Sequence, residues 1–338
     1  MALLMFDGFD YLSPTFQLGT PQVNGRGWTL PVGGSVPTRS GTPGRFGGGC
    51  LSMLYPLAWN LASAAPTLIA GVAINPGGGQ GAVLEFGDGA TCQIGVGYNN
   101  SIGRVFIYTP NTSTIIATGA TPILQNTWNY LEFKATMHDT SGSYELRLNG
   151  LSTPELIASG IKTTTSVNNY ANVCRIVANA CLLDDFYLLD TSGGLSSFLG
   201  DVRVQSLYPT ADGSSVQWAP LAGTNWQSVD DAIGLDSDTT YVSSVTAGQV
   251  DLFQMQDISG APEIFAVQVA VDAKKDDGGL RQVRCKLKTG ATVSNGSSHA
   301  LGSGNYANYV ARWNSEPTTG SPWSAFSVNN AEAGYENV

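Results

Sequence analysis

Charged residues are scarce in this sequence, and acidic residues outnumber basic ones, which argues against some classes of binding partner. Only 12% of the 338 residues are Asp, Glu, Lys or Arg, and the formal net charge is −10. Nucleic acids and anionic lipid surfaces are bound by clustered Lys and Arg side chains, so the excess of acid argues against both. One short basic run occurs at residues 281–288, and its alternation with apolar residues is typical of the solvent face of a strand.

Cysteine and histidine are also few. The odd number of cysteines, without paired spacing, argues against a disulfide framework or a zinc site. His138 and His299 stand far apart, so no Ser–His–Asp or Cys–His catalytic group is expected. No Gly-rich stretch leads into Lys-Ser or Lys-Thr, which argues against a phosphate loop. We expect no cofactor, no metal, and buried free thiols at Cys50, Cys92, Cys174, Cys181 and Cys285.

Long apolar runs and long helical periodicities are missing too. No stretch approaches the ~20 consecutive apolar residues of a membrane-spanning helix. The N-terminal sequence has neither a basic start nor an apolar core, so we expect no signal peptide. Apolar residues nevertheless make up 42% of the chain beside 41 glycines, a combination that indicates a folded, loop-rich protein.

Short β-type runs separated by Gly, Pro, Asn and Asp fill the chain, and this pattern predicts an all-β protein. We expect two β-sandwich domains with jelly-roll-like architecture, at residues 1–195 and 196–338. The mostly apolar run 182–189 should close the first sandwich as a central strand, and the alternating run 201–207 should open the second.

Further strands are predicted along both halves, and two turns are well marked. Gly87-Asp88-Gly89 is a hairpin signal between the runs 83–86 and 92–96. Asp139-Thr140-Ser141-Gly142 links 131–137 to 144–148, and Asn149-Gly150 supplies another turn straight after it. In the run 129–136 the polar residues alternate with apolar ones, which predicts one buried face and one wet face. The other expected strands are 3–9, 51–55, 67–74, 82–87, 91–97, 105–108, 113–117, 143–148, 172–178, 240–243, 250–255, 264–273, 281–289, 291–293 and 308–314, and a short helix is expected within 321–331.

A glycoside hydrolase of sandwich architecture is one alternative. Retaining hydrolysis requires two carboxyl groups only ~5 Å apart, one protonated and one ionised. Glu85 and Asp88 are separated by the start of a turn, and Glu132 and Glu145 are expected singly on wet strand faces. We therefore expect no catalytic residues and no enzyme activity.

A calcium site is a second alternative, because acidic residues occur in pairs. Asp184 and Asp185 lie within a strand, where adjacent side chains face opposite ways, so we expect one to accept loop hydrogen bonds or to pair with Arg. A calcium ion is more plausible in a loop. The loop acids Asp230, Asp231, Asp236 and Asp238 are also explained by Asx turns, which we favour.

Carbohydrate binding requires exposed aromatic rings with polar groups beside them. Four aromatic residues in or beside predicted loops are the candidate glycan contacts, with packing beneath loops as the favoured alternative: Trp28, Trp59, Tyr98 and Tyr108. Four others are expected in the core of the sandwich: Trp128, Phe133, Phe186 and Tyr187.

Several segments of the first half resemble a concanavalin-A-like (laminin-G-like) jelly roll. They are the opening Phe-Asp-Gly-Phe-Asp at 6–10, the Gly-rich patch at 47–51, the strand at 126–133, the hairpin ending at 145–150, and the closing Leu-Asp-Asp-Phe-Tyr-Leu at 183–188. The resemblance implies that the first and last strands of this domain lie side by side.

The whole chain resembles a group of tailed-bacteriophage structural proteins. The segments that carry the resemblance are 198–204, 225–231, 238–242, 273–278 and 323–334. It implies a virion component of the head decoration, fibre or minor tail type, made in the host cytoplasm and exposed on the particle. Its partners would be other virion proteins and further copies of itself, most plausibly in a homo-trimer.

The sequence thus predicts a non-enzymatic structural component of a tailed phage virion that acts through protein–protein docking. The alternative is a lectin-like adhesin that binds glycans on the host surface through the four loop aromatics.

Overall fold

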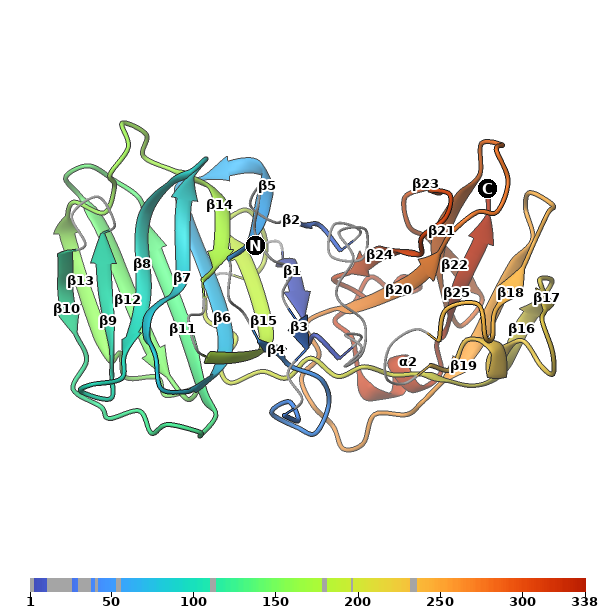
Figure 1. The fold of residues 1–338 in the computed structure, drawn as a ribbon, viewed down its shortest axis with the longest axis horizontal. Coiled ribbons are helices and arrows are strands. Elements are labelled where there is room, and N and C mark those ends of the chain that lie inside the picture. The colour runs from blue at the N-terminus through green and yellow to red at the C-terminus, as the bar shows by residue number, and fades with distance from the viewer. Residues whose placement is uncertain are drawn as a thin grey trace. The chain divides into compact units, whose positions relative to one another are not determined.

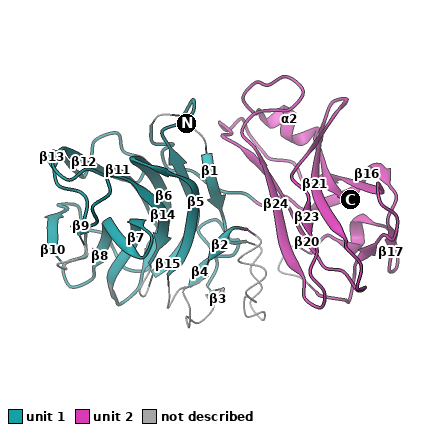
Figure 2. Ribbon diagram, turned by 90° about the horizontal axis from the view of Figure 1, so that it is seen from above, with its two compact units in different colours: residues 1–18, 27–205 teal, residues 19–26, 206–338 magenta. Residues whose placement is uncertain are grey.

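The computed structural model contains two compact units (Figures 1 and 2). It describes residues 3–10, 26–29, 38–39, 42–52, 56–109, 114–177, 181–195, 197–231 and 236–338. Unit 1 comprises residues 1–18 and 27–205, and unit 2 comprises residues 19–26 and 206–338. Residues 196–205 therefore group with the first unit, although we expected the boundary at residue 195.

Unit 1 contains two antiparallel sheets, and the first, sheet A, includes both terminal strands of the unit. β1 and β15 are paired side by side, as the resemblance to the jelly roll implied. Sheet A runs in the order β13 (Leu156–Ile161), β12 (Gly142–Leu148), β11 (Asn129–Thr136), β6 (Thr67–Pro76), β15 (Cys181–Asp190), β4 (Leu51–Ser52) and β3 (Thr38–Arg39), with β1 (Leu3–Asp7) also on β15.

The second sheet of unit 1, sheet B, covers the other side of the core. Its strands run in the order β10 (Thr114–Thr118), β9 (Arg104–Thr109), β8 (Thr91–Asn99), β7 (Gln80–Asp88), β14 (Ala171–Ile176), β5 (Leu57–Ala65) and β2 (Trp28–Thr29). A tight hairpin joins β7 to β8 at Gly89, where φ is positive. The predicted turn after β12 is also present, with positive φ at Asn149 and Gly150.

Aromatic rings fill the space between the two sheets. Phe86 of β7 stacks on Phe133 of β11, with ring centroids 5.2 Å apart. The buried ring of Trp28 lies 5.2 Å from that of Phe186 on β15. These contacts place β7 opposite β11 and β2 opposite β15, so β10 and β13 lie at the same end of the sandwich, as Figure 1 also shows. The all-β sandwich prediction is confirmed.

Unit 2 is also a β protein, built on one larger sheet and two small ones. Sheet C runs in the order β16 (Pro209–Val216), β19 (Val250–Met255), β25 (Glu332–Asn337), β21 (Gln282–Thr289) and β22 (Thr292–Asn295), with β23 (His299–Ala300) on β21. The two-stranded sheets are β17 (Ala219–Pro220) with β18 (Val242–Ser243), and β20 (Val267–Ala273) with β24 (Ala307–Trp313).

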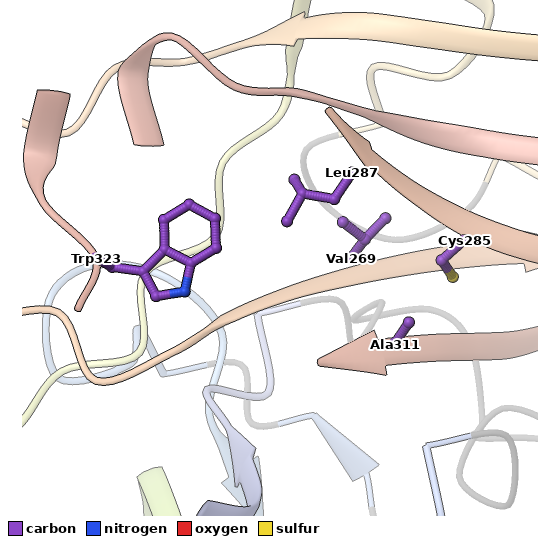
Figure 3. Packing of buried hydrophobic residues seen from close by; sticks show 5 residues of the cluster. All are labelled: Val269, Cys285, Leu287, Ala311 and Trp323. Carbon is purple, nitrogen blue, oxygen red and sulfur yellow. The ribbon is translucent and has the colours of Figure 1, made fainter. Parts of the chain in front are cut away.

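The core of unit 2 forms where sheet C packs on β20 and β24 (Figure 3). Cys285 and Leu287 of β21 point toward Val269 of β20 and Ala311 of β24, and the ring of Trp323 closes one end of this cluster. A short helix, α2 (Ala325–Asn329), follows Trp323 and is capped by the hydroxyl of Ser324. No helix among the described residues is long and apolar enough to cross a membrane.

Two sequence expectations about this half of the chain are wrong. The alternating run 201–207 forms no strand, and the amide of Val204 within it donates to the side chain of Asp185 in sheet A instead of to a neighbouring strand. Two strands of sheet C were not predicted: β25, which lies at the centre of the sheet between β19 and β21, and β16 at its edge.

The basic run on β21 is the outer face of a strand, but its charges are paired. Arg284 donates two hydrogen bonds of 2.8 Å to the carboxylate of Glu336 on β25. Lys288 pairs with Glu332 of the same strand at 2.7 Å. The acids of β25 therefore neutralise the basic strand beside it.

We predict that Arg26 stabilises unit 2 through Asp272. Burial raises the pKa of the Asp272 carboxyl, whereas the Arg26 charge and the Asn308 amide lower it. The Arg26 charge acts on a half-buried carboxyl group, and interactions of this kind contribute about 1 kcal/mol. Arg26→Ala should therefore reduce the free energy of unfolding of unit 2 by about 1 kcal/mol, as measured by chemical denaturation.

The double variant provides the control. When Asp272→Asn has already removed the buried charge, Arg26→Ala should have little further effect. An equal loss in both backgrounds would contradict the pairing.

Candidate functional site

The outer face of sheet A is closed by the chain that leaves it. Residues 198–204, the linker segment, lie across this face. Glu132 of β11 accepts a hydrogen bond of 2.8 Å from the amide of Gly200 and one of 2.5 Å from the Tyr187 hydroxyl. Arg147 of β12 lies over the ring of Phe198, 4.3 Å from its centroid. Glu132 is buried, so the expectation that it stands on a wet face is wrong.

A second buried carboxyl group fixes the end of the linker segment. The bulge at Asp185, where φ is +50°, turns its side chain toward residue 204. Its Oδ1 accepts a hydrogen bond of 2.8 Å from the amide of Val204, and its Oδ2 lies 3.5 Å from the guanidinium of Arg45. The same guanidinium contacts Asp201 and donates to the carbonyl of Val202.

The neighbouring Asp184 binds the loop that carries Arg45. Its Oδ2 accepts a hydrogen bond of 2.8 Å from the backbone amide of Arg45, and its Oδ1 accepts one from the amide of Asp185. The expectation that one of these acids accepts loop hydrogen bonds or pairs with Arg is therefore confirmed for both. No group of three potential metal ligands occurs among the residues that the structure describes.

These buried acids have perturbed proton affinities. Burial raises the pKa of Asp184, and the adjacent charge of Asp185 raises it further. Burial also raises the pKa of Asp185, against the lowering effect of the Val204 amide and Arg45. The pKa of Glu132 is raised by burial as well. Their contacts lie within unit 1, so we assign them a structural role.

The outer face of sheet B carries a different group of side chains. Because Phe86 and Ile107 point into the core, Glu85 on β7 and Tyr108 on β9 point outward. The Tyr108 hydroxyl donates a hydrogen bond of 2.7 Å to Oε1 of Glu85. Oε2 of Glu85 lies 3.6 Å from the guanidinium of Arg175 on β14. An aromatic ring, a carboxylate and a guanidinium thus occupy one row across three strands.

Two glycines of β8 allow aromatic rings to lie close to the sheet. A Cβ atom at Gly95 would stand 2.8 Å from the ring of Tyr108, and one at Gly97 would overlap the ring of Phe106. The two rings lie 5.7 Å apart, centroid to centroid. Because β8 has no side chain at either position, the aromatic side chains of β9 lean over its backbone.

The polar groups of this site are recessed. The side chains of Arg175 and Glu85 expose only 13% and 15% of their surface. Burial raises the pKa of Tyr108, and the Glu85 carboxylate raises it further, so the phenol stays protonated and donates. Burial and Glu85 likewise raise the pKa of the Cys92 thiol, which keeps it neutral. The site offers hydrogen-bond donors and acceptors with no net charge.

The structure separates the four aromatic candidates. Trp28 and Tyr98 were expected in or beside loops, but they are 0% and 1% exposed and cannot contact a glycan in this structure. Trp28 donates to Asp7, and Tyr98 donates to the carbonyl of Ile123. Trp59 is half-buried and packs edge-on against Trp28. Tyr108 alone of the four lies in the row on the outer face of sheet B.

The sequence did not reveal the partners of Tyr108. Glu85 was considered only as a catalytic acid, and Arg175 was not considered. The alternation of Gly95 and Gly97 within a strand was the available signal, because small residues on a strand allow a large group to approach it.

The other acids that were considered have local partners. Asp88 accepts hydrogen bonds from Ser166, Asn168 and Asn172. Glu145 pairs with Arg147 at 2.7 Å. In unit 2, Asp236 accepts from Thr240 in an Asx-type turn, and Asp238 pairs with Lys274.

Comparison with known proteins gives structural likenesses only. No family model and no curated protein matches the chain. Domain 4 of the arabinanase AbnA from Geobacillus stearothermophilus, in complex with arabinotriose, has a TM-score of 0.39 at 11% identity, covering 56% of this chain and 92% of that one. The carbohydrate-binding module CBM66 from Bacillus subtilis has a TM-score of 0.33 at 17% identity, covering 48% and 94%. The Caenorhabditis elegans galectin LEC-6 has a TM-score of 0.31 at 10% identity, covering 40% and 90%. Scores this low carry no argument about a ligand.

The raised pKa values predict that unit 1 loses stability as pH increases. When the pKa of an acid is higher in the folded than in the unfolded state, the folded state binds the extra proton. Stability is then greatest at low pH and falls as pH rises above the ordinary Asp range near 4. Between pH 5 and 8.5 we expect a loss of about 2 kcal/mol, measured by chemical denaturation.

Asp184→Asn should remove much of this pH dependence, since it abolishes one of the two adjacent titrating groups. Asp139→Asn, which alters an exposed acid of the same unit, is the matched control and should leave the dependence unchanged. Wild-type stability that increases from pH 5 to 8.5 would refute the assignment.

Proposed function

We propose that this protein is a non-catalytic binding protein and that unit 1 binds carbohydrate on the outer face of sheet B. The observation that carries the proposal is the row formed by Tyr108, Glu85 and Arg175 on that face. The linker segment covers the outer face of the opposite sheet. The row on sheet B makes none of these contacts with the linker segment.

The chemistry of the row suits a sugar. A pyranose or furanose presents C–H groups that pack on an aromatic ring and hydroxyl groups that require donors and acceptors. Tyr108 offers the ring edge and face, while Glu85 accepts and Arg175 donates. Because the acid and the base neutralise each other, the row favours a neutral sugar over an anionic one.

Binding without turnover is proposed because the single carboxylate of the row is already engaged. Glu85 is held by the Tyr108 hydroxyl on one oxygen and by Arg175 on the other. Glycoside hydrolysis requires a second carboxyl group positioned for acid or base catalysis. The other acids named above, Asp88, Glu132 and Glu145, are bonded to their own neighbours.

The test is a glycan array followed by calorimetry with the sugar that binds most strongly. Tyr108→Ala should weaken binding at least tenfold, and Tyr108→Phe should weaken it less because the ring is retained. Tyr306→Ala, which removes a tyrosine from unit 2, is the matched control and should bind as the wild type does. The proposal fails when no sugar binds, or when Tyr108→Ala binds as tightly as the wild type.

A second candidate is the virion structural protein expected from the sequence resemblance. Large apolar side chains that stand mostly in solvent support it: Val167, Val245, Leu280 and Phe326. Side chains of this kind become buried when a protein docks on other proteins. The low share of charged residues, 12%, is consistent with a surface that is partly covered in an assembly.

Membership of a virion is tested on particles. Mass spectrometry of purified phage should find this chain in a fixed copy number, and gold-labelled antibody should mark one site on the head or tail. The chain's absence from purified particles would exclude this candidate without bearing on glycan binding.

A further inference from the structure

Two edge strands lie at one end of unit 1, and each ends a different sheet. β13 is the last strand of sheet A, and β10 is the last strand of sheet B. The two ends are joined, since Glu155, just before β13, accepts hydrogen bonds from the amide of Thr121, just after β10, and from its hydroxyl. Among the residues that the structure describes, no strand pairs with the outer side of either one.

These two edges lack charge and proline, two of the features that keep most edge strands apart, although the pairing of each strand contains a bulge. Edge strands are commonly very short, or they contain charge or proline, which blocks pairing with another molecule. The sequences of β10 and β13, TIIAT and LIASGI, contain neither. Among the described strands at sheet edges, the others have at most four residues or include a charged residue or proline: β1, β2, β3, β16, β17, β18, β20, β22, β23 and β24.

Exposed isoleucines accompany these two edge strands. Ile157 of β13 is 65% exposed, and Ile115 and Ile116 of β10 are 45% and 38% exposed. Burying such side chains gains roughly 25 cal/mol per Å² of apolar surface. An apolar, hydrogen-bonding edge of this kind fits another β edge of the same character.

The distribution of charge favours a second copy of this chain as the partner of the two edge strands. The chain carries a net charge of −10, so two copies repel each other over most of their surfaces. At this end, β10 and β13 carry no charge, and the sequence on either side of β13 supplies one acid, Glu155, and one base, Lys162. A second copy can therefore approach here without an excess of like charge.

We propose that the end formed by β10 and β13 binds the same end of a second copy of this chain. A two-fold axis perpendicular to the sheets places β13 antiparallel to its counterpart in the partner, and β10 likewise. Such an interface is closed, because the same patch is used by both copies. The result is a two-fold pair, which differs from the trimer expected from the sequence resemblance.

Sedimentation analysis of the whole chain at micromolar concentration tests the proposal. The wild type should sediment as two copies of the 35.4 kDa chain. The double variant Ile115→Lys, Ile157→Lys should sediment as one, because two like charges would face each other in the pair. Val293→Lys alters an exposed residue on the edge strand β22 of unit 2, and this matched control should remain a pair.

Hydrogen exchange of the wild type gives a reading that does not depend on a variant. Amides of residues 114–118 and 156–161 should exchange more slowly at high than at low protein concentration. Circular dichroism checks that the double variant is folded. A wild type that stays monomeric, a trimer, or a pair that survives both lysines would overturn the proposal.

Discussion

Buried carboxyl groups beneath the linker segment are the constraint on which unit 1 depends. A carboxylate loses its hydration on burial, and the cost is several kcal/mol unless hydrogen bonds and an opposite charge compensate for it. Glu132 and Asp185 obtain that compensation from the amides of residues 200 and 204 and from Arg45. The linker segment in turn finds acceptors for amides that no strand ladder satisfies. The linker segment therefore covers the outer face of sheet A, and the polar row lies on sheet B.

The all-β architecture could be predicted from the sequence because residues typical of turns mark the ends of the strands. The strands at 129–136 and 250–255 were predicted to the residue, and the pairing of the first and last strands followed from the jelly-roll resemblance. The run 201–207 alternates as a strand does, but the amide of Val204 is bonded to the distant acid Asp185, which alternation does not reveal. The residues of β25 include Glu, Gly and Asn, which are typical of loops. Its position beside β21 is explained by the ion pairs that its two acids form with the basic residues of that strand.

The candidate site was harder to foresee because it depends on neighbours across strands. The sequence predicts Tyr108 as a loop aromatic. Its place in the candidate site depends on the missing side chain at Gly95, which lets the ring lie over β8, and on the hydrogen bond from the Tyr108 hydroxyl to Glu85. Trp28 and Tyr98 were selected by the same reasoning, and both are core residues. Whether an aromatic side chain is buried is decided by the packing of the two sheets, which the residue type alone does not specify. The row and the uncharged edge involve different strands, although Ile115 of β10 lies directly opposite Tyr108 of β9. A paired molecule would thus present two copies of the sugar-binding row, which strengthens attachment to a surface that displays many sugars.

The account's central claim is that ligand meets the outer face of sheet B and not the face under the linker segment. Hydrogen exchange with and without the strongest-binding glycan tests it most directly. The account predicts slower exchange in residues 80–88, 104–109 and 171–176, with residues 129–136 and 198–204 unchanged. Protection confined to the latter two segments would contradict it.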